Sequence, residues 1–449
     1  MNVQFRWGAH ALVVLVVALL GALLTFVPAG NAAGTQPSAT AEPSASAEPS
    51  ASAEQLARPR YSPPKGPIFN NPLGSAEAQY RVLNQVQDAI KHARRRSTIK
   101  VMSWNIMSRS VVTTLLNAQK RGVRIRALMD HSNLADIPNP YFKRLRRGFV
   151  AQNQNLRREN WSYARTCKRS CRGRGGQAHG KFYLFSHTGT ARNVFMEGSA
   201  NLTAASATNQ WNDLFTFVGD IPLYSFAGSV FDQMWRDRPV RAAFVKKKTA
   251  NGTLYFSPYR GPNFNGDPIQ RLLDNVRCKG ALNVGNRRTI IRVAPDVIRN
   301  ERGLRAARRL KQLWNQGCDV KIAYTILGRD SHDVLRSSSG RGPVPLRHLV
   351  QDFNGDRQFD NYFHLKAISI NGVVGRNRRA HVLMNGSSNL SGMASASDEN
   401  IMIMRKPGAT LAYQRFITHW FDNPPRSARP LPLRPGAAPV DPYAHVDMD

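Results

Sequence analysis

The chain has 449 residues, and 42% of them are hydrophobic, which is enough to bury one core shared by two halves or two separate cores. This composition excludes a disordered protein. The formal net charge of +34 predicts attraction to polyanions, either nucleic acid or an anionic membrane surface. Basic residues gather at 92–97, 143–148, 245–250 and 375–380, although any one of these runs also fits a solvated, solubilising surface.

Residues 1–33 have the order of a secretory signal peptide, with Arg6, an apolar stretch from Ala11 to Val27, and small residues up to Ala33. An uncleaved anchor helix is the alternative, because the apolar stretch is near the lower length that spans a bilayer. Either interpretation places the remaining chain outside the cytoplasm. We therefore expect a secreted protein, retained at the cell surface if the signal is not cleaved.

Residues 34–60 form a Pro-, Ala- and Ser-rich tract with an AEPSAS repeat, which predicts a linker because it offers no apolar surface to bury. Residues 423–449 are also proline-rich and predict a surface tail without regular structure. The folded part should therefore lie between these two segments.

Four cysteines, Cys167, Cys171, Cys278 and Cys318, favour disulfides in an exported chain. Cys278 and Cys318 each lie beside an apolar, strand-like run, so neighbouring strands could pair them. Cys167 and Cys171 would close a small loop. A zinc site is not expected, because it needs two close cysteine pairs and only one C-x3-C occurs.

The chain repeats itself. Residues 97–130 show a strand, a helical pattern ending near a glycine, and a second strand, and residues 288–327 show the same order. Upstream, GPIFNNP at 66–72 answers GPNFNGDP at 261–268, and each leads into a helical pattern. The sequence therefore predicts a duplicated α/β domain, with one half at 61–245 and the other at 246–422.

A polar motif also occurs twice. His179 and Lys181 enter an apolar strand, and a second strand ends at a turn of Gly198, Ser199, Ala200 and Asn201. His364 and Lys366 do the same before the turn of Gly386, Ser387, Ser388 and Asn389. If the two strands of each copy pair antiparallel, the polar groups meet at one edge of a sheet.

The two His-x-Lys and Gly-Ser-x-Asn motifs resemble those of the phospholipase D superfamily, over roughly residues 60–422. The resemblance implies two packed halves, each a mixed sheet flanked by helices, with one shared active site and no metal or cofactor. Lys181 and Lys366 would supply positive charge to a phosphodiester, and Asn201 and Asn389 would donate hydrogen bonds, with Ser199 and Ser387 as weaker candidates.

The resemblance further implies that His179 attacks phosphorus and that His364 is the general acid and base. A histidine that attacks through one nitrogen needs an acceptor on the other, and Asp213 and Glu399 are the candidates. Their offsets from the turn asparagines differ, whereas Asn212 and Asn400 share an offset of eleven residues. The superfamily pattern also places Asp five residues after the lysine, where this chain has Ser186 and Asn371.

The resemblance to secreted bacterial phospholipases D predicts a monomeric enzyme that hydrolyses phospholipid head groups to phosphatidate. A secreted nuclease of the same superfamily is the main alternative, supported by the charge. Against it, the basic runs are not regularly interleaved with aromatic residues, although aromatic residues distant in sequence can converge. A non-catalytic protein that adheres to anionic polymers is the third alternative.

Overall fold

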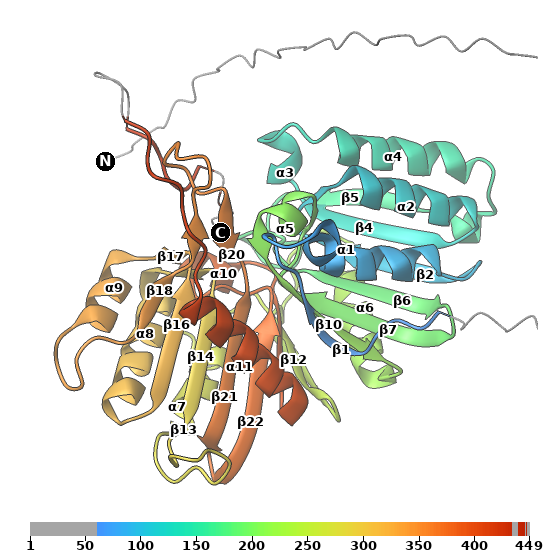
Figure 1. The fold of residues 1–449 in the computed structure, drawn as a ribbon. Coiled ribbons are helices and arrows are strands. Elements are labelled where there is room, and N and C mark those ends of the chain that lie inside the picture. Colours follow the sequence, from blue (N-terminus) through green and yellow to red (C-terminus); the bar gives the residue numbers. More distant parts are fainter. Residues whose placement is uncertain (1–60, 433–438, 445, 447–449) are drawn as a thin grey trace, which may run out of the picture. The chain divides into compact units, whose positions relative to one another are not determined.

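Two α/β halves follow each other along the chain in a computed structural model that describes residues 61–432, 439–444 and 446 (Figure 1). The predicted signal peptide at 1–33 and linker at 34–60 lie outside the described residues. Within the predicted tail, the described residues after Asp422 form no helix or strand.

The first half has a seven-stranded mixed sheet with the order β1-β10-β7-β6-β2-β4-β5. Strands β2, β4 and β5 are parallel, and the others pair antiparallel. Its elements are β1 (Gly66–Phe69), α1 (Ala76–Lys91), β2 (Thr98–Met102), β3 (Ile106–Met107), α2 (Arg109–Lys120), β4 (Arg124–Asp130), α3 (Ser132–Ala135), α4 (Pro140–Asn153), η1 (Arg158–Asn160), β5 (Tyr163–Cys167), β6 (Phe182–Thr188), β7 (Ala191–Gly198), β8 (Leu202–Thr203), α5 (Ala205–Thr208), β9 (Gln210–Trp211), β10 (Asp213–Val218) and α6 (Ile221–Met234).

The second half repeats this order in a larger sheet, β11-β12-β23-β22-β21-β14-β16-β18, with β13 paired to β21. Its elements are β11 (Val245–Thr249), β12 (Gly252–Phe256), α7 (Pro268–Asp274), β13 (Val276–Arg277), β14 (Ile290–Pro295), β15 (Val297–Ile298), α8 (Asn300–Asn315), β16 (Asp319–Tyr324), β17 (Ile326–Leu327), α9 (Arg329–Arg336), β18 (Leu346–His348), β19 (Val350–Gln351), β20 (Asn361–Phe363), β21 (Lys366–Val374), β22 (Asn377–Gly386), α10 (Gly392–Ala396), β23 (Asn400–Met404) and α11 (Pro407–Asp422).

The predicted duplication is confirmed strand by strand. The run β10-β7-β6-β2-β4-β5 corresponds to β23-β22-β21-β14-β16-β18, and the two motif strands of each half pair antiparallel, as expected. Gly122 and Gly317 end the equivalent helices α2 and α8 with positive φ angles of 85° and 94°, a conformation that glycine adopts without strain. The halves differ upstream, because GPIF forms β1 whereas GPNF lies in a loop and the hairpin β11–β12 extends the second sheet instead.

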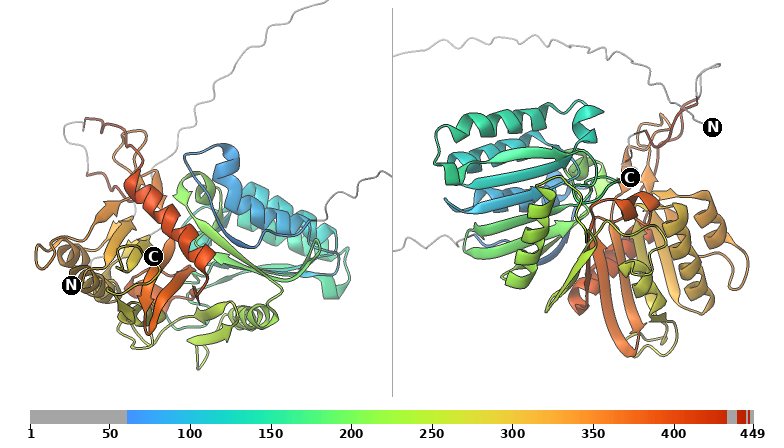
Figure 2. Two further views of the ribbon diagram at one scale, coloured as in Figure 1. Left: turned by 60° about the horizontal axis from the view of Figure 1, so that its bottom comes forward. Right: turned by 180° about the vertical axis from the view of Figure 1, so that it is seen from behind.

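Alternation along the strands divides the core into layers. One face of the first sheet packs under α1, α2 and α4 through Tyr183, Phe185, Val194 and Met196. The opposite face joins α6 and the second half through residues such as Phe182, Leu184, Phe195, Phe256, Leu383, Met402 and Tyr413. The two sheets therefore share a hydrophobic interface, and the views in Figure 2 show α11 beside it.

Short backbone pairings also join the halves close to the motifs. Strand β20 pairs with β9 in parallel, and the backbone N–H of His364 donates to the carbonyl of Trp211 at 3.1 Å. Disulfides link Cys167 to Cys171 and Cys278 to Cys318, which are the expected pairs. None of the helices among the described residues is long and apolar enough to cross a membrane.

Candidate functional site

The turn after β7 and β22 requires glycine because a neighbouring strand passes very close. A Cβ atom on Gly198 would lie 2.4 Å from the carbonyl oxygen of Asp213, and one on Gly386 would lie 2.1 Å from that of Asn400. Real Cβ atoms do not approach so closely, so both motifs begin with the residue that has none. The turn thus brings the start of β10 or β23 directly beside the polar motif.

Each motif lysine folds back onto its own histidine. The Lys181 Nζ atom lies 2.8 Å from the carbonyl of His179 and 2.5 Å from its Nε2 atom. The Lys366 Nζ atom donates to the carbonyl of His364 at 2.9 Å. All four side chains are buried, which strengthens the electrostatic interactions among them.

The Nδ1 atom of each histidine is held by an acceptor from the opposite half. His179 lies 2.9 Å from Oε1 of Glu399, and His364 lies 2.8 Å from Oδ1 of Asn212. The first histidine therefore depends on the second half for its orientation, and the second histidine depends on the first half. A single half could not assemble either histidine with its partner.

These contacts fix which ring nitrogen carries the proton. A lysine ammonium group has no lone pair, so Nε2 of His179 accepts from Lys181 and Nδ1 donates to Glu399. The Asn212 amide nitrogen donates to the carbonyl of Ser206 and to Gln210, so its oxygen is the atom that faces His364. Nδ1 of His364 therefore donates as well, and both Nε2 atoms carry the lone pair in the neutral rings.

Glu399 holds a histidine, as predicted, but Asp213 does not. Asp213 accepts from Asn385 at 3.1 Å and from Tyr413 at 2.5 Å, at the interface of the halves. Strand register explains the error: Leu214 pairs with Gly198 and Ile401 pairs with Gly386, so Asp213 is equivalent to Asn400, and Asn212 to Glu399. The second copy is one residue shorter between its turn and this position, which makes the equal offset of eleven residues misleading.

The two motif serines position the acceptors that hold the histidines. Ser199 Oγ donates to Asn212 at 2.8 Å, and Ser387 Oγ donates to Glu399 at 2.5 Å. Each hydroxyl also accepts a backbone N–H, from Asp213 at 3.0 Å or from Asn400 at 2.9 Å. Both serines therefore order the histidine partners, and their contact with a phosphate stays a prediction.

Each turn asparagine is buried just after the second motif strand of its own half, Asn201 after β7 and Asn389 after β22. Oδ1 of Asn389 accepts the backbone N–H of Val297 at 3.3 Å, which leaves Nδ2 as the side of this amide that can donate. The roles of Asn201 and Asn389 in holding phosphate stay predictions.

Charged groups of both motifs act on the same titratable side chains. Burial lowers the pKa of His364 well below its ordinary value, and Lys366, Lys181 and His179 lower it further. Burial raises the pKa of Glu399 to about 8, while Lys181, Ser387 and Lys366 act in the opposite direction. Groups of both halves thus set the charge on each other, and His364 is neutral in the empty site at neutral pH.

Two residues near the motifs were missed by sequence reasoning. The Asp296 carboxylate lies 3.1 Å from Nζ of Lys366 and 3.9 Å from Nε2 of His364. At the equivalent position of the first half, the Trp104 ring lies 5.9 Å from Nζ of Lys181 and packs edge-on against His179. Trp104 follows the buried strand β2, and Asp296 follows the equivalent strand β14. Aligning the two repeats places these residues at the same position, and that alignment is the sequence signal that could have found them.

Ser186 and Asn371, which stand where the superfamily pattern has Asp, lie away from the site. Five residues along a strand span about 17 Å, so neither side chain is near its motif lysine. Ser186 instead accepts the backbone N–H of Thr98 at 2.8 Å, and Asn371 accepts from Asn283 at 2.7 Å. These positions secure strand ends and loops, so their substitution does not alter the histidine and lysine cluster.

No cluster of three or more metal-ligating side chains occurs among the described residues. The acidic segment at 352–360 binds its own backbone: Asp352 accepts the N–H groups of Gly355 at 2.6 Å and Arg357 at 3.0 Å. The positive charge of the site is supplied by its own two lysines.

Comparison with known proteins gives one family match. The model described as the phospholipase D-like domain of cardiolipin synthase matches residues 86–235. No curated protein matches the sequence.

Several solved structures are similar to this chain at low identity. Polyphosphate kinase from Porphyromonas gingivalis has a TM-score of 0.48 and 12% identity, and the match covers 79% of this chain but only 49% of that protein. Phosphatidylserine synthase from Haemophilus influenzae also has a TM-score of 0.48, with 13% identity and coverage of 79% and 86%. Nuc from Salmonella typhimurium, a phospholipase D family member, has a TM-score of 0.29 and 20% identity, covering 39% of this chain and 97% of its own.

The family match lies in the first half, and the strand order and the His-x-Lys and Gly-Ser-x-Asn motifs recur in the second. Residues 86–235 are thus similar to a phospholipase D-like domain, and the repeated motifs extend the resemblance to the second half.

Proposed function

We propose that this chain is a phosphodiesterase that works through a phosphohistidine intermediate and needs no metal. One observation carries the proposal: two buried histidines, each with a lysine folded onto it, have their Nδ1 atoms held by acceptors from opposite halves. Because both Nδ1 atoms donate to these acceptors, Nε2 is the ring atom of each histidine that carries the lone pair for chemistry at phosphorus. The two lysines offset the negative charge of the phosphodiester oxygens, which otherwise repels a nucleophile.

The reaction would proceed in two displacements. Nε2 of His179 attacks phosphorus, the P–N bond forms, and the bond from phosphorus to the leaving oxygen breaks as His364 gives that oxygen a proton. Water then attacks phosphorus while His364 accepts its proton, and the P–N bond breaks to release His179. Each step uses the Nε2 atom that the hydrogen bonds assign to it.

The different partners support this division of roles. The carboxyl group of Glu399 can carry negative charge that stabilises the positive ring formed when His179 attacks, whereas the Asn212 amide cannot. The pKa of His364 is depressed in the empty site by burial and by the two lysines. A bound phosphodiester anion would counter those cations and raise this pKa, so that His364 is protonated when the leaving group departs.

Export is part of the proposal. Two disulfides indicate an oxidising compartment, which agrees with the signal peptide predicted for residues 1–33.

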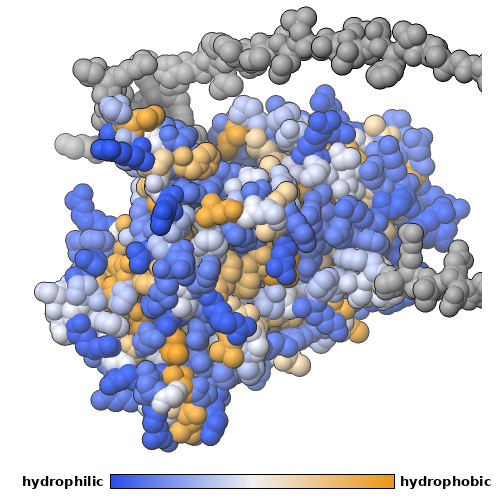
Figure 3. Space-filling view, viewed as in Figure 1, coloured by the Kyte–Doolittle hydropathy of each residue, from blue (hydrophilic) through white to orange (hydrophobic). Residues whose placement is uncertain are grey.

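Two substrate classes are candidates. Phospholipid head groups are the substrate that the sequence resemblance predicts. Nucleic acid is favoured by a different observation: the net charge is +34, and large exposed hydrophobic side chains, such as Ile137, Val150 and Ile221, lie on separate segments of the chain. The face shown in Figure 3 is largely hydrophilic, with hydrophobic residues in small groups, whereas docking on a lipid surface favours a continuous apolar patch.

Hydrolysis of bis(p-nitrophenyl) phosphate in the presence of EDTA tests the chemistry. We expect His179→Ala to lose at least about 10³-fold in rate and to form no covalent intermediate. His364→Ala should still accumulate the acid-labile phosphohistidine, because p-nitrophenolate leaves without a proton. His332→Ala is the control, since that side chain is 50% exposed on α9.

Loss of activity in EDTA, or near-full rates in both motif variants, would refute the proposal. Product analysis on phosphatidylcholine, phosphatidylglycerol, single-stranded DNA and duplex DNA at moderate salt then separates the substrate classes. Head-group release with intact DNA identifies a lipase, and the reverse identifies a nuclease.

A further inference from the structure

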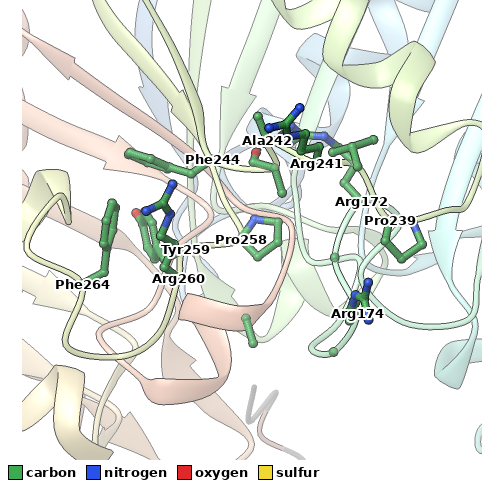
Figure 4. Close-up of a pocket in the computed structure, with 15 residues that line it drawn as sticks. Arg172, Arg174, Pro239, Arg241, Ala242, Phe244, Pro258, Tyr259, Arg260 and Phe264 are labelled. Carbon is green, nitrogen blue, oxygen red and sulfur yellow. Dashed lines mark hydrogen bonds between the residues drawn. The ribbon is translucent and has the colours of Figure 1, made fainter.

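A cavity of about 750 Å³ lies where the first half passes into the second, outside the histidine and lysine cluster. Its wall combines arginines, aromatic rings and prolines from 172–175, 239–244, 258–260, Phe264 and Ala396, and it contains no acidic residue. In Figure 4, Phe244, Tyr259, Arg260 and Phe264 lie on one side, with Arg241 and Arg174 on the other and Pro258 between. The cavity therefore offers both cations and flat apolar surfaces.

Three of the four arginines are available to a ligand. Arg174, Arg241 and Arg260 are exposed, and across the residues that the structure describes their guanidinium groups form no ion pair with a carboxylate. Arg172 differs, because it is buried and donates to Gln233, to the carbonyl of Ser257 and to the carbonyl of Ala243. Arg172 holds the wall, and the other three can contact anions.

The rings come from separated parts of the sequence and converge. Phe244 lies 5.3 Å from Phe264 and 5.1 Å from Tyr259 between ring centroids. Phe244 and Phe264 also line a second cavity of about 520 Å³, whose wall includes Tyr255 and the exposed cations Lys246, Arg271 and Arg405. We call these ten residues the basic–aromatic track: Arg174, Arg241, Phe244, Lys246, Tyr255, Tyr259, Arg260, Phe264, Arg271 and Arg405.

The track adjoins the catalytic histidines along the chain. The wall of the first cavity includes Ala396, three residues before Glu399, and Gly175, four residues before His179. Between them, the backbone N–H of Asp398 donates to the carbonyl of Gln177 at 2.9 Å, which ties the two segments together. A polymer lying in the track would therefore reach the region of the histidines within a few residues' length.

We infer that the basic–aromatic track binds single-stranded nucleic acid, with its cations on the phosphates and its rings against the bases. This inference rests on the proposed phosphodiesterase activity, since a strand held there would be the substrate. Unpaired bases expose faces that stack on aromatic rings, and alternating cations follow the backbone. The sequence runs lack this interleaving, and the fold creates it by bringing together 174, 241–246, 255–264, 271 and 405.

An anionic membrane would use the same cations but not the same rings. Phe244, Tyr259 and Phe264 are half-buried around a concavity, where they suit an inserted planar group better than a flat lipid surface. The rings therefore decide between the two ligands.

Binding of a fluorescent oligothymidylate, measured by anisotropy over a range of salt, tests the inference in the full chain carrying His179→Ala to prevent cleavage. Arg174→Ala, Arg241→Ala and Arg260→Ala combined should lower the slope of log affinity against log salt by about 2. The matched control is Arg144→Ala, Arg146→Ala and Arg147→Ala on α4, which removes the same charge from exposed positions and should change the slope little.

Phe244→Leu should weaken oligothymidylate binding about tenfold and leave inorganic polyphosphate binding unchanged, because only the bases stack. Equal losses in the track and control variants, or an equal effect of Phe244→Leu on polyphosphate, would overturn the inference. So would track-dependent binding to phosphatidylglycerol vesicles without binding to the oligonucleotide. Track variants that keep His179 should retain bis(p-nitrophenyl) phosphate turnover. If the unmodified chain did not hydrolyse bis(p-nitrophenyl) phosphate, the proposed phosphodiesterase activity would be refuted. The oligothymidylate measurements would then still decide whether the track binds single strands.

Discussion

The two halves share strand order, motifs and lysine contacts, yet they place different groups behind their histidines. His179 has the Glu399 carboxyl group at Nδ1 and the Trp104 ring beside it. His364 has the Asn212 amide at Nδ1 and the Asp296 carboxylate 3.9 Å from Nε2. The duplication thus gives both histidines the same backbone setting. Charged groups in one half are replaced by neutral groups at the equivalent positions of the other, so the two histidines have different electrostatic surroundings.

A second set of equivalent positions also pairs acids of one half with amides of the other. Glu197 and Asp213 belong to the first half, and their equivalents in the second half are Asn385 and Asn400. The amides donate to Glu197 at 2.8 Å and 3.0 Å across the interface. If both halves carried carboxylates here, four buried acids would face one another without donors. The difference between the halves is therefore required at these two pairs of equivalent positions.

The largest effect on this comparison is expected from Glu399→Gln. An amide cannot stabilise positive charge on His179, and its nitrogen can face Nδ1 in the wrong sense. We expect kcat to fall by about 10²- to 10⁴-fold, with little change in KM for a small diester. Steady-state kinetics on bis(p-nitrophenyl) phosphate measure this. An unchanged kcat would show that His179 is not the residue that attacks.

The next expected effect concerns stability. Burial raises the pKa of Glu197 to about 8, with Asp213 adding to the shift and the two amides opposing it. The folded state therefore retains a proton that Glu197 of the unfolded chain loses near the ordinary pKa of 4.5, and stability falls as pH rises from there through about 8. Urea unfolding between pH 5 and 9 should show this slope, of the order of a few kcal/mol. Glu197→Gln should reduce the slope without removing it, because burial also raises the pKa of Glu399 to about 8.

Glu77→Gln is the matched control for this measurement, because Glu77 is exposed in the first turn of α1. It should leave the pH dependence of unfolding as it is in the unmodified chain. An unchanged slope in Glu197→Gln would assign the whole titration to other buried groups.

Much of this arrangement could be predicted from the sequence. Periodicity and repetition predicted the duplicated α/β halves and both strand pairs, because these depend on local pattern. Export and cysteine spacing made the two disulfide pairs candidates without fixing the pairing. The crossed contacts could not be obtained in this way. Which acceptor reaches which histidine depends on how the halves pack, and a one-residue difference after the turn displaced the expected acceptor from Asn212 to Asp213. Asp296 and Trp104 carry no motif and become visible only when the two copies are superposed in register.

The two halves also differ in the length of the loop that each disulfide closes, and therefore in the expected stabilisation. Cys278 and Cys318 close a loop of 40 residues in the second half, whereas Cys167 and Cys171 close one of 4 in the first. Constraint of the unfolded chain predicts stabilisation of about 4 and about 2 kcal/mol, respectively. Urea unfolding of the two double Cys→Ser variants should show the larger loss for Cys278 and Cys318. All four sites are buried, so each variant controls for the other, and equal losses would contradict the loop-length explanation.

The smallest expected effect is a shift in pH profile, and it tests the asymmetry at His364. If His364 donates a proton to the leaving group, kcat/KM for a substrate with a poor leaving group falls as pH rises through its depressed pKa. Asn212→Asp places a negative charge at Nδ1, raises that pKa and should extend activity upward by about one pH unit, about tenfold in rate above the original limit.

Asp296→Asn removes a carboxylate near Nε2 of His364 and should move the high-pH limb of the kcat/KM profile to lower pH. Opposite shifts in the two variants identify His364 as the proton donor. A common direction would mean that the limb belongs to another group. Asn212 also donates to Ser206 and Gln210, so Asn212→Asp could lower stability, and its thermal unfolding is measured as a control. The quantity compared is the pH at which kcat/KM falls, because this pH does not depend on the amount of folded enzyme.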